Sequence, residues 1–449
     1  MNRKIYSTIF YSKNLLFNPL LIKNIRAAWY NQFVSEDELI KIQKDKIKKL
    51  LFHAYNNCPY YKKSFDDAGF HPEQFKEIND IERIPILTKR DIKENIDRLR
   101  VNFLSYRNEE VYTSGTTGIP LRFYRDTGSK FWMTALFVRT VKNFGCSIGS
   151  KTAWIWGLPK EYESLDFRKN NFKSHFIKNT TWFNAFDMNN ESMYAFADFS
   201  FKFKPELVIG YVSSIFEYAK FIDKNNLNFY PPKAIWLTAE PIEKEQRDFI
   251  EKVFKSNVYS QYGSSEILHI GYECNSHKGL HVHADSRLVE ITDDKGKNLA
   301  PGELGYVVIT DFENYVMPII RYKNDDISSY SEFKCNCGIK FPLLDFVKGR
   351  IYNVFKLKNG KQIYGHMFSR KLFNYVKEIQ QFQIHQKTFD NIDVLIVPGD
   401  IKNKEVLINE LLNYFKYYTG DEVSYNFKFV DYIERERSGK LLYTKSDIV

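Results

Sequence analysis

Cysteine is scarce in this sequence, with five residues among 449. Five cysteines at uneven spacing are too few for the disulfide framework of a secreted protein of this length. The scarcity therefore excludes a disulfide-rich scaffold and favours a reducing cytoplasmic environment.

Long apolar runs are missing as well. The segment 1–30 is rich in apolar and aromatic residues, but Lys13, Asn14, Asn18 and Lys23 interrupt it. It never reaches the roughly 20 apolar residues that a membrane-spanning helix needs, and no signal-peptide cleavage pattern follows it. We expect an amphipathic helix that packs on the body of the protein, without a transmembrane segment. The alternative is peripheral contact with a membrane, because aromatic and basic residues alternate there.

A dense basic tract is also absent, although Lys and Arg outnumber Asp and Glu by 65 to 55. The surplus is spread along the chain, which favours a solvated basic surface and an anionic small-molecule ligand over a nucleic-acid partner. Internal repeats and low-complexity tracts are missing too. What is present is the composition of a globular protein, 43% hydrophobic and 27% charged, with the length for two or three domains.

Helical and strand patterns alternate through the first part of the chain. Residues 35–66 have apolar positions at helical spacing, opened by Ser35 and Glu38 in a capping-box arrangement. Further helices are predicted at 131–144 and 213–224, and strands at 152–156, 206–211, 234–237 and 257–259. This order predicts an α/β fold with a parallel sheet covered by helices. Ligands bind at the carboxyl ends of such strands, so we expect 238–241 and 261–266 to supply binding groups.

The pattern changes after Ser286 to alternating strands and turns, which predicts a smaller β region over about 286–348. Beyond it a hairpin, a strand, a helix around 405–415 and a further strand predict a compact α+β module. We therefore predict an N-terminal core of residues 1–348 and a C-terminal domain of residues 349–449.

The segment 110–124, EVYTSGTTGIPLRFY, joins two predicted strands through a loop of small residues. Its glycines let the backbone approach a ligand closely and its hydroxyl groups add donors, which suits a polyphosphate. It is not a Walker loop, because Ile119 and Pro120 follow the second glycine where Lys and Ser or Thr are required. The alternative for the segment alone is a polar hairpin turn. The loop residues are Ser114, Gly115, Thr116, Thr117 and Gly118.

Six motifs follow one another along the chain. They are YTSGTTGIP at 112–120, AEP at 239–241, QYGSSE at 261–266, GELGYVVIT with PIIRYKNDD at 302–326, GR at 349–350 and SGK at 438–440. In this order they resemble the adenylate-forming superfamily, and within it the phenylacetate–CoA ligase-like branch with its CapK-type, capsular-polysaccharide relatives. The resemblance spans nearly the whole chain. It implies a large core of helix-covered sheets and a small α+β C-terminal domain that rotates after adenylation.

The resemblance also implies a role for each motif. The loop 114–118 would hold the ATP phosphates, Glu266 would bind the bridging Mg²⁺, and Ser265 would contact the α-phosphate. Asp326 would bind the ribose hydroxyls with Arg350 beside it, and Lys440 would neutralise the charge that builds up during adenylation. The implied catalytic residues are Lys440, Glu266 and Thr116. The other residues expected at the nucleotide are Ala239, Glu240, Pro241, Gln261, Tyr262 and Gly263.

Two positions depart from the family's pattern. Asp325 stands where the family usually carries glycine before the ribose aspartate, so the choice of Asp326 depends on register. Asn353 stands where the family often has an acidic hinge residue, although asparagine also accepts unusual backbone angles. Taken singly, Asp326 also fits a turn carboxylate, Glu266 a helix N-terminal acid and Lys440 a solvated tail residue.

A second candidate site lies in two segments rich in cysteine and histidine, ECNSHKGLHVH at 273–283 and CNCG at 335–338. Four such ligands suffice for a closed tetrahedral zinc ion, which would be structural. The predicted ligands are Cys274, His277, Cys335 and Cys337. His281 and His283 are alternatives for the histidine, and a set of unmetallated buried cysteines is the alternative to a metal site.

We therefore predict an ATP- and Mg²⁺-dependent, AMP-forming ligase that activates a carboxylic acid and transfers the acyl group to coenzyme A. The first alternative transfers it to an amine or hydroxyl of an amino sugar or polysaccharide precursor. The second is a non-catalytic nucleotide-binding protein that retains the fold. We expect the acid near Trp182, Tyr211 and His269.

Overall fold

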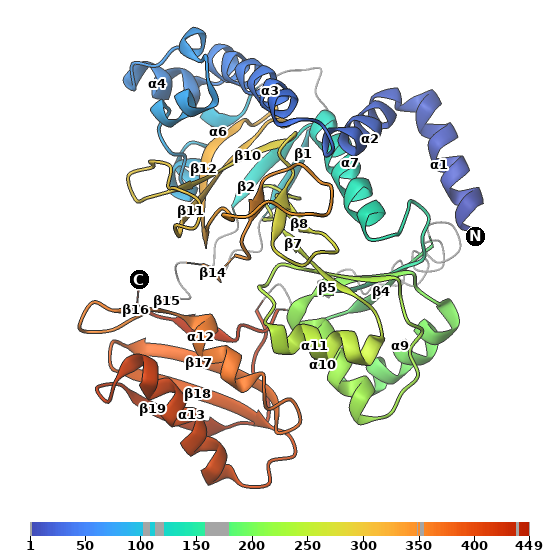
Figure 1. Cartoon of the computed structure of the whole chain (residues 1–449), viewed down its shortest axis with the longest axis vertical. Helices are drawn as coiled ribbons and strands as arrows, with labels where there is room; N and C mark the ends of the chain where they lie inside the picture. The colour runs from blue at the N-terminus through green and yellow to red at the C-terminus, as the bar shows by residue number, and fades with distance from the viewer. Residues whose placement is uncertain are drawn as a thin grey trace. The chain divides into compact units, whose positions relative to one another are not determined.

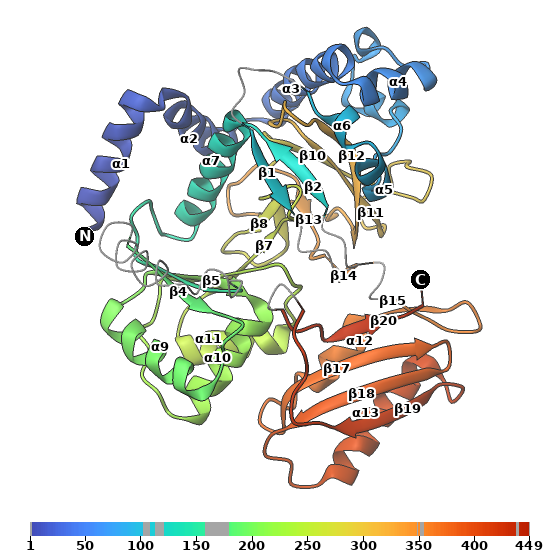
Figure 2. The same ribbon diagram turned by 180° about the vertical axis from the view of Figure 1, so that it is seen from behind.

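The computed structural model describes residues 2–101, 108–112, 121–157, 179–347, 349–350, 354–436 and 440–448. The chain forms two compact units, each assembled from two segments. Unit 1 contains Met1–Gly149 and Tyr259–Val347, and unit 2 contains Ser150–Val258 and Lys348–Val449. Figures 1 and 2 show their elements from opposite sides. The expected division into residues 1–348 and 349–449 stays a prediction.

Helices dominate the first part of unit 1. They are α1 (Arg3–Phe17), α2 (Pro19–Asn31), α3 (Glu36–Asn57), α4 (Pro59–Asp67), η1 (Pro72–Gln74), η2 (Ile78–Arg83), α5 (Lys89–Glu94), α6 (Ile96–Leu99) and α7 (Thr127–Asn143). The Ser35 side chain caps α3 by accepting a hydrogen bond from the Glu38 amide at 3.3 Å. The helical pattern predicted over 35–66 is divided at Cys58, because Pro59 opens α4 and a proline favours the first position of a helix.

The strands of unit 1 are antiparallel. A hairpin pairs β1 (Glu109–Tyr112) with β2 (Arg122–Arg125). The predicted β region contains β10 (Arg287–Thr292), β11 (Gly305–Asp311) and β12 (Ile319–Ser328), paired in that order. The strands β7 (Val258–Tyr262), β8 (Gly271–Glu273), β9 (Leu280–Val282) and β13 (Leu343–Leu344) pair in the same way. One apolar core joins these strands to the helices, and its buried members include Leu50, Phe123, Ile309 and Ile320.

The first segment of unit 2 has the predicted parallel sheet with helices on one face. Its strands are β3 (Thr152–Trp156), β4 (Thr180–Asn184), β5 (Leu207–Tyr211) and β6 (Ala234–Thr238), in the order β4-β3-β5-β6. Ile155, Val208 and Ile235 alternate onto the face covered by α9 (Asn190–Phe203), α10 (Val212–Lys224) and α11 (Lys244–Phe254). The α/β class is confirmed.

The second segment of unit 2 is the α+β module. A four-stranded sheet has the order β19-β18-β17-β20, with β17 (Ile379–Thr388), β18 (Asn391–Pro398), β19 (Ser424–Phe429) and β20 (Thr444–Ser446). The apolar face of α13 (Lys404–Thr419) buries Leu407, Leu411 and Phe415. The predicted hairpin forms from β15 (Val354–Lys356) and β16 (Gln362–Tyr364), and the shorter elements are β14 (Gly349–Arg350) and α12 (Gly365–Leu372).

None of the helices within the described ranges is long and apolar enough to cross a bilayer.

Candidate functional site

The predicted phosphate loop itself lies outside the described residues, which end at Tyr112 and resume at Leu121. This concerns Ser114, Gly115, Thr116, Thr117 and Gly118. The strands on either side of the loop form one hairpin in which Tyr112 lies opposite Arg122. The fold therefore brings the two ends of the loop together.

Arg125, the last residue of β2, joins this hairpin to the QYGSSE segment. Its guanidinium donates hydrogen bonds to the backbone carbonyls of Ser265 and, at 3.4 Å, Glu266. Arg125 is buried, and desolvation lowers its pKa although nearby carboxylates oppose the shift. A charged donor aimed at two carbonyls fixes the turn that carries Glu266. Arg125 thus acts on the predicted metal-binding residue through the backbone.

The QYGSSE turn is closed by bonds between Ser264 and Ile267. The Ser264 amide donates to the Ile267 carbonyl at 3.0 Å, and the Ile267 amide donates to Ser264 Oγ at 3.1 Å. Gly263 suits the close packing before this turn, since a Cβ there would lie 2.8 Å from Gln261 Nε2 and 3.1 Å from the His269 amide nitrogen. Gln261 Nε2 itself donates to the Tyr262 carbonyl at 2.8 Å. Ser265 lies exposed on the turn.

Alternate side chains of β12 meet the QYGSSE segment. Asp326 is buried and accepts hydrogen bonds at 2.8 Å from both Tyr262 Oη and Asn324 Nδ2. Asn324 Nδ2 also donates to Tyr262 Oη at 2.7 Å. Tyr322 Oη donates to Glu266 Oε1 at 3.1 Å. Because strand residues two apart share a face, β12 places these side chains against Tyr262 and Glu266 of this segment.

The register of β12 settles the geometry of the neighbouring aspartates. Pairing with β11 is irregular between Tyr306 and Val308, and Asp325 takes a φ of 66° at this irregularity. A positive φ is the conformation for which glycine is preferred, and aspartate is among the residues that tolerate it. Asp325 therefore holds a backbone conformation for which glycine is preferred, while Asp326 is the carboxylate that accepts a hydrogen bond from Tyr262. Arg350 lies in β14.

The AEP turn follows β6 in unit 2. Ala239 has a φ of 72°, and Glu240 turns back to the start of α10. The Glu240 carboxylate accepts hydrogen bonds from the Ser213 amide at 2.6 Å and from Ser213 Oγ at 2.9 Å. Burial raises the pKa of Glu240, whereas Ser213 and Lys440 oppose the shift. Its side chain anchors the turn to a helix N-terminus, which leaves the exposed Ala239 and Pro241 for contact with a ligand.

Lys440 reaches the same end of the parallel sheet. Its Nζ lies 5.3 Å from the centroid of the Tyr211 ring, at the end of β5. The next residue, Leu441, donates its amide to Ser213 Oγ at 3.4 Å. Lys440 belongs to the last predicted motif and Glu240 to the second. Unit 2 therefore brings the segments of two motifs together that are far apart in the sequence.

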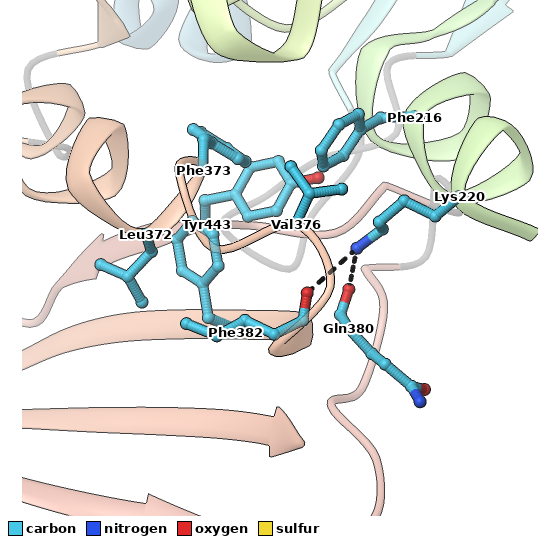
Figure 3. Close-up of a pocket in the computed structure, with 9 residues that line it drawn as sticks. Phe216, Lys220, Leu372, Phe373, Val376, Gln380, Phe382 and Tyr443 are labelled. Carbon is cyan, nitrogen blue, oxygen red and sulfur yellow. Dashed lines mark hydrogen bonds between the residues drawn. The ribbon is translucent and has the colours of Figure 1, made fainter. Parts of the chain in front are cut away.

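The segment before Lys440 is attached to α10 by charged and polar contacts. Arg435 forms an ion pair with Glu217 of α10, and Gln381 Nε2 donates to the same carboxylate at 3.1 Å. Lys220, one turn along α10, donates to the backbone carbonyls of Ile379, at 3.5 Å, and Gln380. Burial lowers the pKa of Lys220 to about 8, although Glu217 opposes the shift. Figure 3 shows Lys220 in a small pocket whose lining includes the aromatic rings of Phe216, Phe373 and Tyr443.

The residues predicted near the acid fall in both units. Trp182 and Tyr211 share one face of the parallel sheet, where Trp154 stacks on Trp182 with ring centroids 4.9 Å apart and Trp156 lies 4.3 Å from Tyr211. His269 belongs to unit 1 and has a φ of 54°. Burial lowers the pKa of His269 to about 3, and the positive charges of three nearby arginines contribute to the shift. The ring is therefore neutral at physiological pH.

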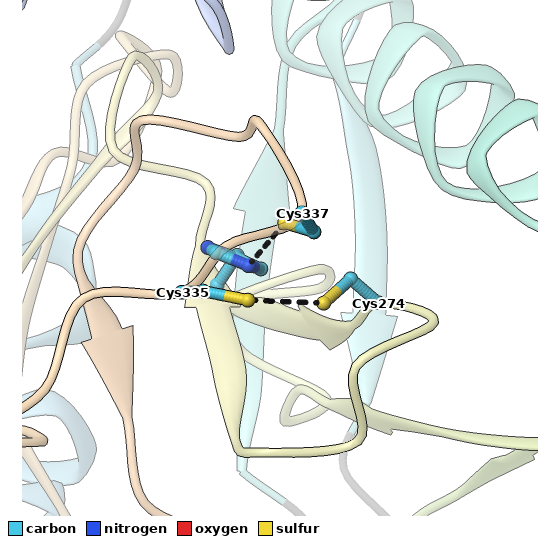
Figure 4. A group of neighbouring side chains, drawn as sticks. Cys274, Cys335 and Cys337 are labelled. Atoms are coloured by element: carbon cyan, nitrogen blue, oxygen red, sulfur yellow. Dashed lines mark hydrogen bonds between the residues drawn. The ribbon is translucent and has the colours of Figure 1, made fainter.

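The second site is a cluster of Cys274, His281, Cys335 and Cys337, whose ligand atoms lie within 4.8 Å of one another. The Cys274 and Cys335 sulfurs are 3.6 Å apart, and Cys337 Sγ is 3.2 Å from His281 Nε2. Figure 4 shows these sulfurs converging from two loops. Zn–S bonds of about 2.3 Å give ligand separations of about 3.7 Å in a tetrahedron, so the donor set and spacing fit zinc.

The histidine beside the three cysteines is His281, whereas the spacing in the sequence favoured His277. The Nδ1 atom of His277 lies 2.9 Å from Glu273 Oε1, and its ring stacks on Tyr259. His281 is buried on β9 with its Nδ1 3.1 Å from the Phe341 carbonyl, which leaves Nε2 toward Cys337. His277, which has a φ of 51°, therefore has its ring against Glu273 and Tyr259. His283 instead contacts Arg139.

Four residues that contact the predicted motifs were not foreseen, namely Arg125, Tyr322 and Asn324 in unit 1 and Ser213 in unit 2. The sequence held a signal for two of them, since Tyr322 and Asn324 precede Asp326 at strand spacing within one predicted strand. Arg125 and Ser213 act through contacts between segments distant in the sequence, for which no local pattern exists.

Known proteins resemble the chain at three levels. A family model described as the CapK C-terminal domain matches residues 355–447. The chain is 24% identical to Protein CapK of Staphylococcus aureus over 97% of this chain and 99% of that protein. It is 23% identical to a phenylacetate-coenzyme A ligase of Escherichia coli (strain K12) over 83% of this chain and 85% of that protein. A solved 2-hydroxyisobutyryl-CoA ligase in the postadenylation state matches with a TM-score of 0.77 at 18% identity, over 93% of this chain and 91% of that chain.

The structural match establishes the fold, with its large α/β part and smaller C-terminal part, and confirms the predicted fold class. The sequence matches extend over most of the chain and include the C-terminal model. Together with the ordered motifs, they confirm the predicted resemblance to CapK and to the phenylacetate–CoA ligases.

Proposed function

We propose that the chain is an ATP- and Mg²⁺-dependent, AMP-forming ligase that acts on a carboxylic acid. The carboxylate oxygen attacks the α-phosphorus of ATP, the bond to the β-phosphate bridging oxygen breaks, and pyrophosphate leaves. The resulting acyl-adenylate has AMP as its leaving group, whereas the free carboxylate would have to expel oxide. A thiol, with coenzyme A as the expected acceptor, then displaces AMP.

The observation that carries this proposal is the meeting of Lys440 with the AEP turn in unit 2. Lys440 lies over Tyr211, and its neighbour Leu441 shares Ser213 with Glu240. A lysine ammonium at the carboxyl ends of parallel strands is suited to stabilise negative charge on a carboxylate and a phosphate that approach each other. The relatives include a phenylacetate-coenzyme A ligase, which supports the same reaction class.

Unit 1 carries further groups proposed for the nucleotide. Asp326, fixed by Tyr262 and Asn324, has a carboxylate that can accept hydrogen bonds from the ribose hydroxyls. Glu266, which accepts from Tyr322, provides a carboxylate oxygen of the kind that Mg²⁺ prefers. When bound, Mg²⁺ would neutralise charge on the ATP phosphates. Ser265 and the loop 114–118 are proposed to contact those phosphates.

A second acceptor class is supported by the similarity to Protein CapK, which spans nearly all of both chains. In this version the acyl group passes to an amine or hydroxyl of an amino sugar or polysaccharide precursor. Activation of the acid is the same in both versions, so only the second half-reaction separates them.

We also propose that Cys274, His281, Cys335 and Cys337 hold one structural zinc ion. Four protein ligands leave no open position for substrate, so the ion would stabilise unit 1 rather than act on the acid. Burial and the neighbouring thiols raise the pKa of Cys337 to about 12, so binding of the metal would release a proton. All five cysteines are free thiols, which fits the proposed cytoplasmic location.

The experiment that tests the activity is acid-dependent exchange of labelled pyrophosphate into ATP, screened over aromatic, fatty, amino and hydroxy acids. Exchange with one class of acid supports adenylation. ATP binding without exchange for any acid would instead indicate a nucleotide-binding protein that has kept the fold. Competition between coenzyme A and amino sugars for the preformed adenylate then identifies the acceptor.

Lys440→Ala is expected to slow this exchange by at least about 100-fold while ATP binding stays nearly unchanged, because the lysine acts on charge that develops during the reaction. Lys445→Ala, which removes an exposed lysine of β20, is the matched control and should exchange like the wild type. An unchanged exchange rate in Lys440→Ala would remove the role assigned to this lysine.

A further inference from the structure

The helix α1 presents an apolar stripe on its outer side, interrupted by the exposed Ser12. Ile5, Ile9 and Leu16 lie at i, i+4 and i+11, which places them on one helix face. Leu15 and Phe17 extend the apolar surface at the end of the helix. All five side chains are more than half exposed.

The opposite side of α1 is the one that packs on unit 1. Phe10 contacts an apolar cluster formed by α2 and α7, whose members include Leu21, Ile22 and Val138. Asn14 on the same side is buried, and its Nδ2 donates to the Phe10 carbonyl at 2.8 Å. Within unit 1, α1 lies at the edge in both views (Figures 1 and 2). The stripe therefore faces away from the contacts that hold α1 in place.

The charge of this segment is of one sign. Residues 1–35 contain five basic and no acidic side chains, and the first acidic residue is Glu36. The basic residues are Arg3, Lys4, Lys13, Lys23 and Arg26, all on exposed positions. Lys13 follows Ile9 by four residues and precedes Leu16 by three, so it borders the stripe. An apolar face flanked only by positive charge is complementary to a lipid bilayer, which has an apolar interior and anionic headgroups at its surface.

We propose that α1 and the start of α2 dock the protein on an anionic membrane surface, with the stripe in the interface and the basic residues among lipid headgroups. The 15 residues of α1 give a length of about 22 Å, enough to lie along the surface and too short to cross it. Self-association through this face is disfavoured, because two copies would bring five positive charges against five.

The test is flotation of the full chain with vesicles of phosphatidylcholine alone and of equal parts phosphatidylcholine and phosphatidylglycerol. Binding is expected to the anionic vesicles, weakening as salt is raised. The double variant Ile9→Asp with Leu16→Asp should bind at least about tenfold more weakly. Reversing charge in Lys4→Glu with Lys13→Glu should weaken binding roughly fivefold or more for each lysine.

Tyr417→Asp, which alters an exposed aromatic residue on α13, is the matched control and should float like the wild type. Circular dichroism confirms that each variant is folded, which is expected because the altered side chains are exposed. The proposal is overturned if the wild type stays with the unbound fraction, or if the Ile9 and Leu16 variant floats equally well. Sedimentation showing a dimer that this variant converts to monomer would assign the face to a second copy of the chain instead.

Discussion

Asp325 and Asp326 show how adjacent residues of one type serve different purposes at the residue scale. Asp325 holds a left-handed backbone conformation, with a φ of 66°, at an irregularity of β12. Asp326 directs its carboxylate to Tyr262 and Asn324. Backbone conformation decides the first position and side-chain chemistry the second, so the two should respond to different substitutions.

Asp326→Asn is expected to weaken ATP binding by about tenfold or more, because it replaces a charged acceptor for the ribose hydroxyls with a neutral amide. Asp325→Asn is the matched control. Asparagine also tolerates a positive φ, so this variant should bind ATP and unfold like the wild type. Isothermal titration with ATP measures both, and equal losses in the two variants would contradict the assignment to Asp326.

Glu313 is a buried carboxylate whose ionisation should be visible in stability. Burial raises its pKa from 4.5 to about 6, although Lys46, 2.6 Å away, opposes the shift. A carboxyl with a raised folded-state pKa contributes its stability fully below pH 4.5, and this contribution is lost as the pH rises through 6. Between pH 5 and pH 7.5 it should lower the free energy of unfolding by about 1 kcal/mol.

Glu313→Gln removes this titration, so the stability of wild type relative to the variant should fall by about that amount from pH 5 to pH 7.5. Urea unfolding at several pH values measures the difference. Glu332→Gln, at an exposed glutamate, is the control and should follow the wild type. A parallel pH dependence in wild type and Glu313→Gln would show that the carboxyl is not perturbed.

At the scale of elements, α10 connects the parallel sheet to the segment that carries Lys440. Its first turn supplies Ser213, which contacts both Glu240 and Leu441. One turn later Glu217 binds Arg435, five residues before Lys440. The Glu436 amide, next to Arg435, donates a hydrogen bond to the Lys440 carbonyl at 2.9 Å. This bond links the residue that follows Arg435 directly to Lys440. Glu217 therefore helps to fix the segment that carries Lys440.

Glu217→Ala is expected to slow adenylation on the order of tenfold through loss of this positioning, measured as pyrophosphate release with the acid that the exchange screen identifies. Transfer from preformed acyl-adenylate to the acceptor should be unchanged, since the role proposed for Lys440 belongs to adenylation. Asp223→Ala, at an exposed acid on the same helix, is the control. A purely structural role of Glu217 would slow both half-reactions equally, and restoration by Glu217→Arg with Arg435→Glu would confirm the pair.

Elements with a strong local signal were predictable from the sequence. The parallel strands and α10 follow from apolar runs separated by a helical pattern, and Ser35 marks the start of α3 through its side-chain cap. The choice between His277 and His281 was not predictable, because it depends on a turn conformation and on the Phe341 carbonyl. Arg125 belongs to the same class, since its partners lie in another segment.

For the molecule as a whole, the proposed zinc ion would join loops that are about 60 residues apart within unit 1. Metal analysis should find about one zinc per chain, and none after Cys335→Ser with Cys337→Ser. Loss of the ion is expected to lower Tm by more than about 5 °C, because the binding energy is available only to the folded state.

Substitution of the two histidines tests whether the zinc ligand is His281, which lies in the cluster, or His277, which the sequence spacing favoured. His281→Asn should abolish or strongly reduce the zinc content, whereas His277→Ala should retain it. Cys146→Ser, at a buried cysteine outside the cluster, is a further control and should keep its zinc. Retention of zinc in His281→Asn together with its loss in His277→Ala would assign the ligand to His277.

Neither unit is continuous along the chain, and this has a consequence for how the protein is made. The core of unit 1 joins Leu50 and Phe123 to Ile309 and Ile320, so it cannot close until residue 347 has left the ribosome. At 5 to 20 residues per second, the first segment waits roughly 10 to 40 s for the second. During that interval α3 and α4 expose the apolar side chains that they later bury. The nascent chain, rather than the finished protein, is thus the state most vulnerable to aggregation.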